Sequence, residues 1–129
     1  MTAKATGDPA TRSTLEAVLR FNEAFDRRDV DGVMAAMTED CVFENTCPPP
    51  DGERYAGQDA VRSFWRRFFS ASPDARFTTE EIFASGNRCF VRWRYDWKGD
   101  DGTPAHVRGV DIFLVRGGKV AEKLAYVKG

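Results

Sequence analysis

The chain has 129 residues, which suits one ordinary domain and is too short for two. Its 19 Lys and Arg against 20 Asp and Glu leave a formal charge of −1, which gives no reason to expect a nucleic-acid-binding surface. Three cysteines without a Cys-x-x-Cys motif, and a single histidine, do not supply the roughly four ligands of a usual zinc site, so we expect no metal and no other cofactor.

Residues 1–10 lack the apolar run of a signal peptide, and no stretch of the sequence is apolar over the length needed to cross a membrane. The cysteines are most simply free thiols of a reducing compartment. We therefore expect a cytoplasmic protein without membrane contact. Residues 1–10 are predicted to be a disordered head, and residues 11–129 a single domain.

The first element is predicted to be a helix over 11–28, since Leu15, Val18 and Phe25 recur at helical spacing. Asp29 can cap a short second helix, whose inner face carries Val30, Val33, Met34 and Met37. A change of period then predicts a strand over 41–45, followed by a loop that three prolines keep extended.

A third helix is predicted to begin near Gly57 or Gln58, with a wide apolar face that includes Trp65. After it, strand-like segments run to the end of the chain, roughly over 75–84, 88–97, 105–116 and 119–128. The short turns between these segments predict an antiparallel meander. Helices first and strands afterwards are typical of the α+β class.

Asp111 is the most informative residue, because its neighbours along the strand face, Gly109 and Phe113, offer no side-chain hydrogen bonds. Burying a carboxylate costs roughly several kcal/mol of free energy unless the group is paired, protonated or hydrogen-bonded. Two interpretations stay open at this point. Asp111 either pairs with an arginine or faces solvent, or it is an acid in a pocket with a raised pKa.

Two further features point to the same place. Asn45 ends the apolar row of Cys41 and Phe43, where it either closes the strand or faces a pocket. Trp93, Tyr95 and Trp97 share one strand face, which suits a thick core or a pocket wall. Tyr126 of the last strand could bring a phenol to the same pocket.

The order and spacing of several short motifs resemble the NTF2-like superfamily, and in particular the SnoaL-like polyketide cyclases and the relatives of ketosteroid isomerase. The resemblance covers about residues 12 to 127 and rests on Arg20-Phe21-Asn22-Glu23-Ala24-Phe25, Asp29-Val30-Asp31-Gly32, Asp40-Cys41-Val42-Phe43, Tyr55-Ala56-Gly57, Gly109-Val110-Asp111-Ile112-Phe113-Leu114-Val115 and Gly117-Gly118-Lys119-Val120 with Glu122.

This resemblance implies a cone in which three N-terminal helices pack on a strongly curved, mostly antiparallel sheet and enclose a pocket. Asp111 falls where the isomerases carry a protonated aspartate and the cyclases their acid/base aspartate. Asn45 falls where an isomerase has its general base, and Phe21 replaces the tyrosine of its oxyanion hole. Because two of three isomerase groups are missing, we do not expect steroid isomerisation.

We therefore expect a pocket for an apolar cyclic small molecule, with Asp111 and Asn45 as catalytic residues for an aldol-type cyclisation or an isomerisation. The predicted pocket residues are Phe21, Phe43, Trp65, Trp93, Tyr95, Trp97, Phe113 and Tyr126. A non-catalytic module that binds a ligand or a protein is the alternative, since the fold alone does not fix a function. A homodimer is also expected, both from the resemblance and because Phe90, Val110, Ile112 and Leu114 share the face opposite the pocket.

Overall fold

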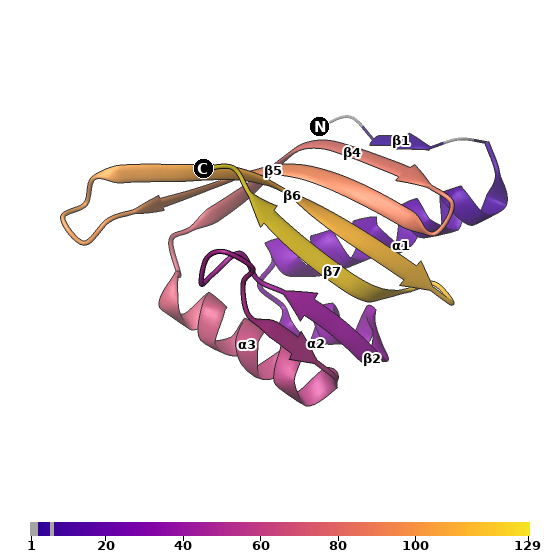
Figure 1. Cartoon of the computed structure of the whole chain (residues 1–129), viewed down its shortest axis with the longest axis horizontal. Coiled ribbons are helices and arrows are strands. Elements are labelled where there is room, and N and C mark those ends of the chain that lie inside the picture. The colour runs from indigo at the N-terminus through magenta and orange to yellow at the C-terminus, as the bar shows by residue number, and fades with distance from the viewer. Residues whose placement is uncertain (1–2, 6) are drawn as a thin grey trace.

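The computed structural model describes residues 3–5 and 7–129, in which three helices lie against one seven-stranded sheet (Figure 1). The helices are α1 (Pro9–Asp26), α2 (Val30–Ala35) and α3 (Gln58–Ala71). The strands are β1 (Ala3–Ala5), β2 (Met37–Glu44), β3 (Arg54–Ala56), β4 (Arg76–Ser85), β5 (Arg88–Lys98), β6 (Pro104–Arg116) and β7 (Lys119–Val127). Their order across the open sheet is β1-β4-β5-β6-β7-β2-β3, so the predicted α+β class is confirmed.

Local capping explains where the first two helices begin. The Asp8 carboxylate accepts a hydrogen bond from the Thr11 amide at 2.8 Å, and Pro9 opens α1, where a missing N–H costs nothing. Asp29 caps α2 as the sequence predicted, by accepting a hydrogen bond from the Gly32 amide at 3.0 Å. The expected grouping of three N-terminal helices is not confirmed, because β2 and β3 come between α2 and α3.

Part of the predicted disordered head, residues 1, 2 and 6, lies outside the described residues. Within the described part, Ala3–Ala5 form β1, which pairs in parallel with β4. Pro9 and Ala10 already belong to the first turn of α1. No helix of the described chain combines the length and the apolar character needed to cross a membrane.

The hairpins from β4 to β7 form the predicted antiparallel meander, in which each strand pairs with the next one along the chain. Gly86, Gly117 and Gly118 adopt positive φ in the tight turns, a conformation that glycine reaches without steric cost. Beside the meander, β2 pairs in parallel with β7, a contact between distant parts of the sequence. This pairing brings the strand that ends near Asn45 next to the last strand.

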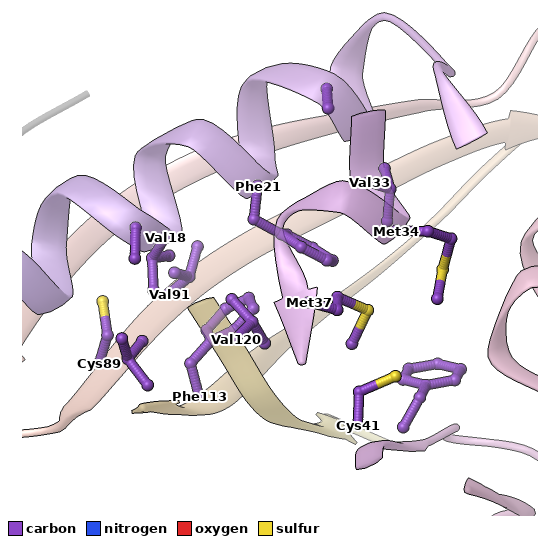
Figure 2. Close-up of a cluster of buried hydrophobic side chains, with 14 of the residues drawn as sticks. Val18, Phe21, Val33, Met34, Met37, Cys41, Cys89, Val91, Phe113 and Val120 are labelled. Carbon is purple, nitrogen blue, oxygen red and sulfur yellow. The ribbon is translucent and has the colours of Figure 1, made fainter. Parts of the chain in front are cut away.

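The hydrophobic core lies between the three helices and the inner face of the sheet, and Figure 2 shows its part beside α1 and α2. Phe21 of α1 contacts Phe113 of β6 edge to face, with ring centroids 5.5 Å apart, and both side chains are fully buried. The predicted pocket residues Phe21 and Phe113 are thus core residues, because α1 lies directly over this part of β6. Cys41 and Cys89 are buried in the same core as free thiols.

Candidate functional site

A small cavity lies between α1, α3 and the inner face of the sheet, and we call it the aromatic cavity. Its volume is about 100 Å³. The polar side chains in its lining are Asn45, Thr46, Asp111 and Lys123. Its aromatic lining comes from α1, α3, β2, β4 and β5 and comprises Phe25, Phe43, Phe64, Trp65, Phe68, Phe77, Trp93 and Tyr95.

Asp111 projects into the aromatic cavity from the middle of β6 and is only 8% exposed. Its carboxylate oxygen Oδ2 lies 3.3 Å from Nζ of Lys123 on the neighbouring strand β7. The sheet register explains this approach, since Asp111 is opposite Ala125 and Lys123 is opposite Phe113, which makes the charged residues diagonal neighbours on one face. The partner of Asp111 is therefore a lysine, and not the arginine of one of the two interpretations.

Lys123 is the charged site residue that the sequence analysis missed, and the aromatic lining residues missed with it are Phe25, Phe64, Phe68 and Phe77. The side chain of Lys123 is buried, and Nζ lies over the rings of Phe43, Trp65 and Phe25 at 5.0, 5.3 and 5.5 Å from their centroids. Aromatic faces attract a cation at such distances, so these rings stabilise the ammonium group beside Asp111. The available signal was the alternation in β7, which puts Lys123 between Ala121 and Ala125, two small residues that leave space for it.

Burial raises the pKa of Asp111 above its ordinary value, because removal from water disfavours the charged form. The positive charge of Lys123 and the nearby indole of Trp93 act in the opposite direction and only partly offset this effect. A raised pKa makes the ionised carboxylate a stronger base, which favours removal of a proton from a bound molecule. The site thus has the electrostatic properties of an acid/base group.

Trp93 occupies the wall next to Asp111 because Gly109 leaves room for it. Trp93 and Gly109 are opposite each other in the β5–β6 register. A Cβ atom added at Gly109 would overlap both the Trp93 indole and the Tyr126 backbone oxygen. A glycine in a strand often marks such a close approach.

Asn45 lies at the rim of the aromatic cavity, directly after β2. Its side-chain oxygen accepts a hydrogen bond from the Thr46 amide at 2.8 Å, which fixes the amide group and leaves its NH₂ group as a donor. Pro50, Asp51 and Gly52 line an adjoining surface hollow that also includes Asn45. The proline loop therefore runs beside the opening of the cavity.

The structure brings together some of the predicted site residues and separates others. Phe43, Trp65, Trp93 and Tyr95 line the aromatic cavity with Asp111 and Asn45. Trp97 lies further along β5, where it stacks on Tyr95 with centroids 5.4 Å apart and lines a different surface hollow. Tyr126 is on the opposite face of the sheet and 53% exposed, because the alternation of β7 that turns Lys123 inward turns Tyr126 outward.

Among the described residues, no group of three His, Cys, Asp or Glu side chains is placed to hold a metal ion. In the part of the chain that the structure describes, the carboxyl group of Asp111 and the ammonium group of Lys123 are the oppositely charged pair of the aromatic cavity. Proton transfer and charge stabilisation are the chemistry that these two groups can carry out with their own atoms.

The family model of the SnoaL-like domain matches residues 18–123. An NTF2-like protein of unknown function from Mesorhizobium loti is 39% identical to the chain, with a TM-score of 0.82, and the match covers 96% of this chain and 98% of that one. No curated protein matches the chain.

More distant solved structures share the fold. TerC, co-crystallised with polyporic acid, is 20% identical over 90% of this chain and 92% of its own, with a TM-score of 0.77. A candidate polyketide cyclase from Xanthomonas campestris pv. campestris is 23% identical over 92% of this chain and 93% of its own, with a TM-score of 0.73. At these identities the comparison establishes a common architecture.

Proposed function

Because this chain belongs to the SnoaL-like domain family, we propose that its aromatic cavity binds an apolar cyclic metabolite and that Asp111 moves a proton next to a carbonyl group of that molecule. The observation that carries the proposal is a buried carboxyl group with a raised pKa in a cavity of aromatic side chains. Similarity to TerC and to a candidate polyketide cyclase supports a cyclic ligand.

The reaction begins when the ionised Asp111 removes a proton from the carbon next to the carbonyl group. The electrons of the broken C–H bond form a carbon–carbon double bond, and the carbonyl electron pair moves to oxygen, which gives an enolate. The NH₂ group of Asn45 and the ammonium group of Lys123 are the donors that stabilise this oxygen.

The second half of the reaction returns the proton. In an isomerisation, protonated Asp111 gives it to another carbon of the enolate system. In an aldol-type cyclisation, the enolate carbon attacks a second carbonyl carbon of the same molecule, and Asp111 protonates the resulting alkoxide. Neither route needs a metal or an organic cofactor.

A second candidate function is non-catalytic binding of a ligand or a protein. Two observations favour it: aromatic side chains leave a volume of only about 100 Å³, and Asp111 already has the partner Lys123. A buried ion pair can exist for structural reasons alone.

Hydrogen–deuterium exchange separates the two functions without knowledge of the natural substrate. Small cyclic ketones such as cyclopentanone and cyclohexanone are incubated with the protein in D₂O, and loss of the proton next to the carbonyl group is followed by NMR. We expect exchange faster than in buffer, and a loss of about 10²- to 10⁴-fold in Asp111→Asn. Asp96→Asn, which changes an exposed carboxylate of β5, is the matched control and should keep the wild-type rate. If no ketone exchanges faster than in buffer, the catalytic function is refuted and non-catalytic binding is the function that remains.

A further inference from the structure

Three buried polar atoms of residues that line the aromatic cavity have no hydrogen-bond partner. They are Oδ1 of Asp111, the oxygen that Lys123 does not contact, Nε1 of Trp93 and Nε1 of Trp65. The three residues are only 8%, 6% and 1% exposed. Groups buried to this degree are nearly always hydrogen-bonded in folded proteins, so several of them around one cavity indicate the place of a ligand atom.

Oδ1 of Asp111 and Nε1 of Trp93 have complementary needs. Oδ1 of Asp111 accepts a hydrogen bond, whereas the indole N–H of Trp93 donates one. Asp111 is opposite Val91 and Trp93 is opposite Gly109, so the two side chains are diagonal neighbours on the inner face of β5 and β6. The indole is close enough to lower the pKa of Asp111, although it falls short of a direct hydrogen bond.

A hydroxyl group satisfies both atoms at once, since its O–H donates to Asp111 and its oxygen accepts from Trp93. A carbonyl or ether oxygen satisfies Trp93 alone, and an ammonium group satisfies Asp111 alone. The ammonium group of Lys123, on the other carboxylate oxygen, favours an oxygen that carries partial negative charge. Phenols and enols are more acidic than alcohols, so their O–H is the stronger donor to Asp111 and their oxygen takes up negative charge more readily beside Lys123.

The size of the aromatic cavity limits the rest of the ligand. A volume of about 100 Å³ is below the roughly 300–1,000 Å³ of sites that enclose drug-sized molecules. A dry cavity of about 150 Å³ in another protein holds one benzene molecule. Because the aromatic cavity is smaller still, one six-membered ring beside Asp111 is the upper limit and requires the walls to move outward slightly. Aromatic walls suit a flat ring.

We propose that the aromatic cavity selects a single-ring phenol or enol, whose hydroxyl group bridges Oδ1 of Asp111 and Nε1 of Trp93. This inference rests on the proposed function, because it assigns the ligand class of the same cavity. It also fits that chemistry, since a phenol is a stable counterpart of the enol that proton transfer next to a ring carbonyl produces.

Isothermal titration calorimetry with three probes tests the hydroxyl group and the ring size separately. Phenol has the ring and the hydroxyl, toluene has a methyl group in place of the hydroxyl, and 2-naphthol adds a second ring. We expect phenol to bind at least about tenfold more tightly than toluene, because toluene leaves both buried atoms without partners. 2-Naphthol should bind more weakly than phenol. Equal affinity for phenol and toluene, no binding of phenol, or tighter binding of 2-naphthol would each overturn the proposal.

Three matched variants locate the hydroxyl group. Trp93→Phe removes the indole N–H but keeps an aromatic ring, and phenol affinity should fall about tenfold while that of toluene stays within about twofold. Trp97→Phe makes the same change on the same strand outside the aromatic cavity and should keep the preference for phenol. Trp65→Phe removes the other unpartnered indole N–H of the cavity and tests the competing donor. A preference that survives Trp93→Phe, or that only Trp65→Phe removes, would contradict the assignment to Trp93.

These binding measurements stand apart from the exchange experiment. Phenol selectivity without ketone exchange would keep the ligand class and refute the acid/base role of Asp111. Ketone exchange without phenol selectivity would keep the acid/base role and refute the hydroxyl bridge.

Discussion

At the scale of single residues, the pair of Asp111 and Lys123 links the chemistry of the site to the stability of the fold. Both side chains are buried, and each compensates the charge of the other. Without its partner, each buried ion would cost roughly several kcal/mol. The pKa of Asp111 is nevertheless raised, because burial outweighs the attraction of Lys123. The folded protein therefore binds a proton at Asp111 more readily than the unfolded chain does.

This difference makes a prediction for stability against pH. The favourable contribution of protonated Asp111 is fully present below the unfolded pKa of about 3.9 and is lost as pH rises through the higher folded pKa. Asp111→Asn lacks this ionisation, so the free energy of unfolding of the wild type, relative to the variant, should fall as pH rises across that window. Urea denaturation of both proteins between about pH 4 and pH 8 measures this difference in the free energy of unfolding.

The double variant Asp111→Asn with Lys123→Met controls for the lysine that the single variant leaves unpaired. Lys123→Met alone should destabilise the protein by about 3–5 kcal/mol near neutral pH, because Asp111 loses its counter-charge, and the double variant should recover much of this loss. A wild type that becomes more stable relative to Asp111→Asn as pH rises would instead mean that the folded pKa of Asp111 is depressed.

At the scale of the elements, β6 depends on one glycine. Gly109→Ala places a methyl group against the Trp93 indole and the backbone of β7, so we expect a loss of about 1–3 kcal/mol in stability. Trp93 must also move, which should weaken phenol binding. Denaturant unfolding and phenol calorimetry check the two effects.

Gly102→Ala is a useful comparison for Gly109→Ala, because Gly102 has positive φ in an exposed turn with open space around its Cβ position. This variant should lose some stability through backbone strain but should keep phenol affinity. Unchanged phenol affinity in Gly109→Ala would show that Trp93 is not fixed by the close approach.

Local patterns predicted much of this architecture. The capping of α2 by Asp29, the apolar face of α3 and the hairpins from β4 to β7 depend on neighbouring residues, so they could be inferred from the sequence. The parallel pairing of β2 with β7 could not, because it joins segments far apart in the chain. The role of Lys123 was missed for the same reason, since its partner and its aromatic neighbours belong to other elements.

At the scale of the whole molecule, the outer face of the sheet carries an apolar row across four strands. Phe83, Phe90, Ile112 and Leu124 are successive cross-strand neighbours, and Phe83 and Phe90 are 42% and 40% exposed. Contiguous exposed apolar surface is costly in water and often marks an interface. The predicted homodimer through this face therefore remains our proposal for the assembly.

Substitution on this row tests the dimer. Phe90→Lys puts a charge at its centre and should convert a dimer into a monomer, as sedimentation velocity at tens of micromolar concentration would show. Tyr126→Lys, on the same face but outside the row, should change the assembly less. A wild-type chain that sediments as a monomer would refute the proposal.

The position of β7 in the sheet order has a consequence for synthesis on the ribosome. This strand is the last of the described elements to be made, yet it lies between β6 and β2 and carries Lys123. Until it emerges, β2 has no sheet partner on that side, and Asp111 has no counter-charge. The nascent chain therefore cannot complete this sheet before β7 has left the ribosome, and the half-formed sheet, with apolar surfaces uncovered, is the stage at which chaperones have most to protect.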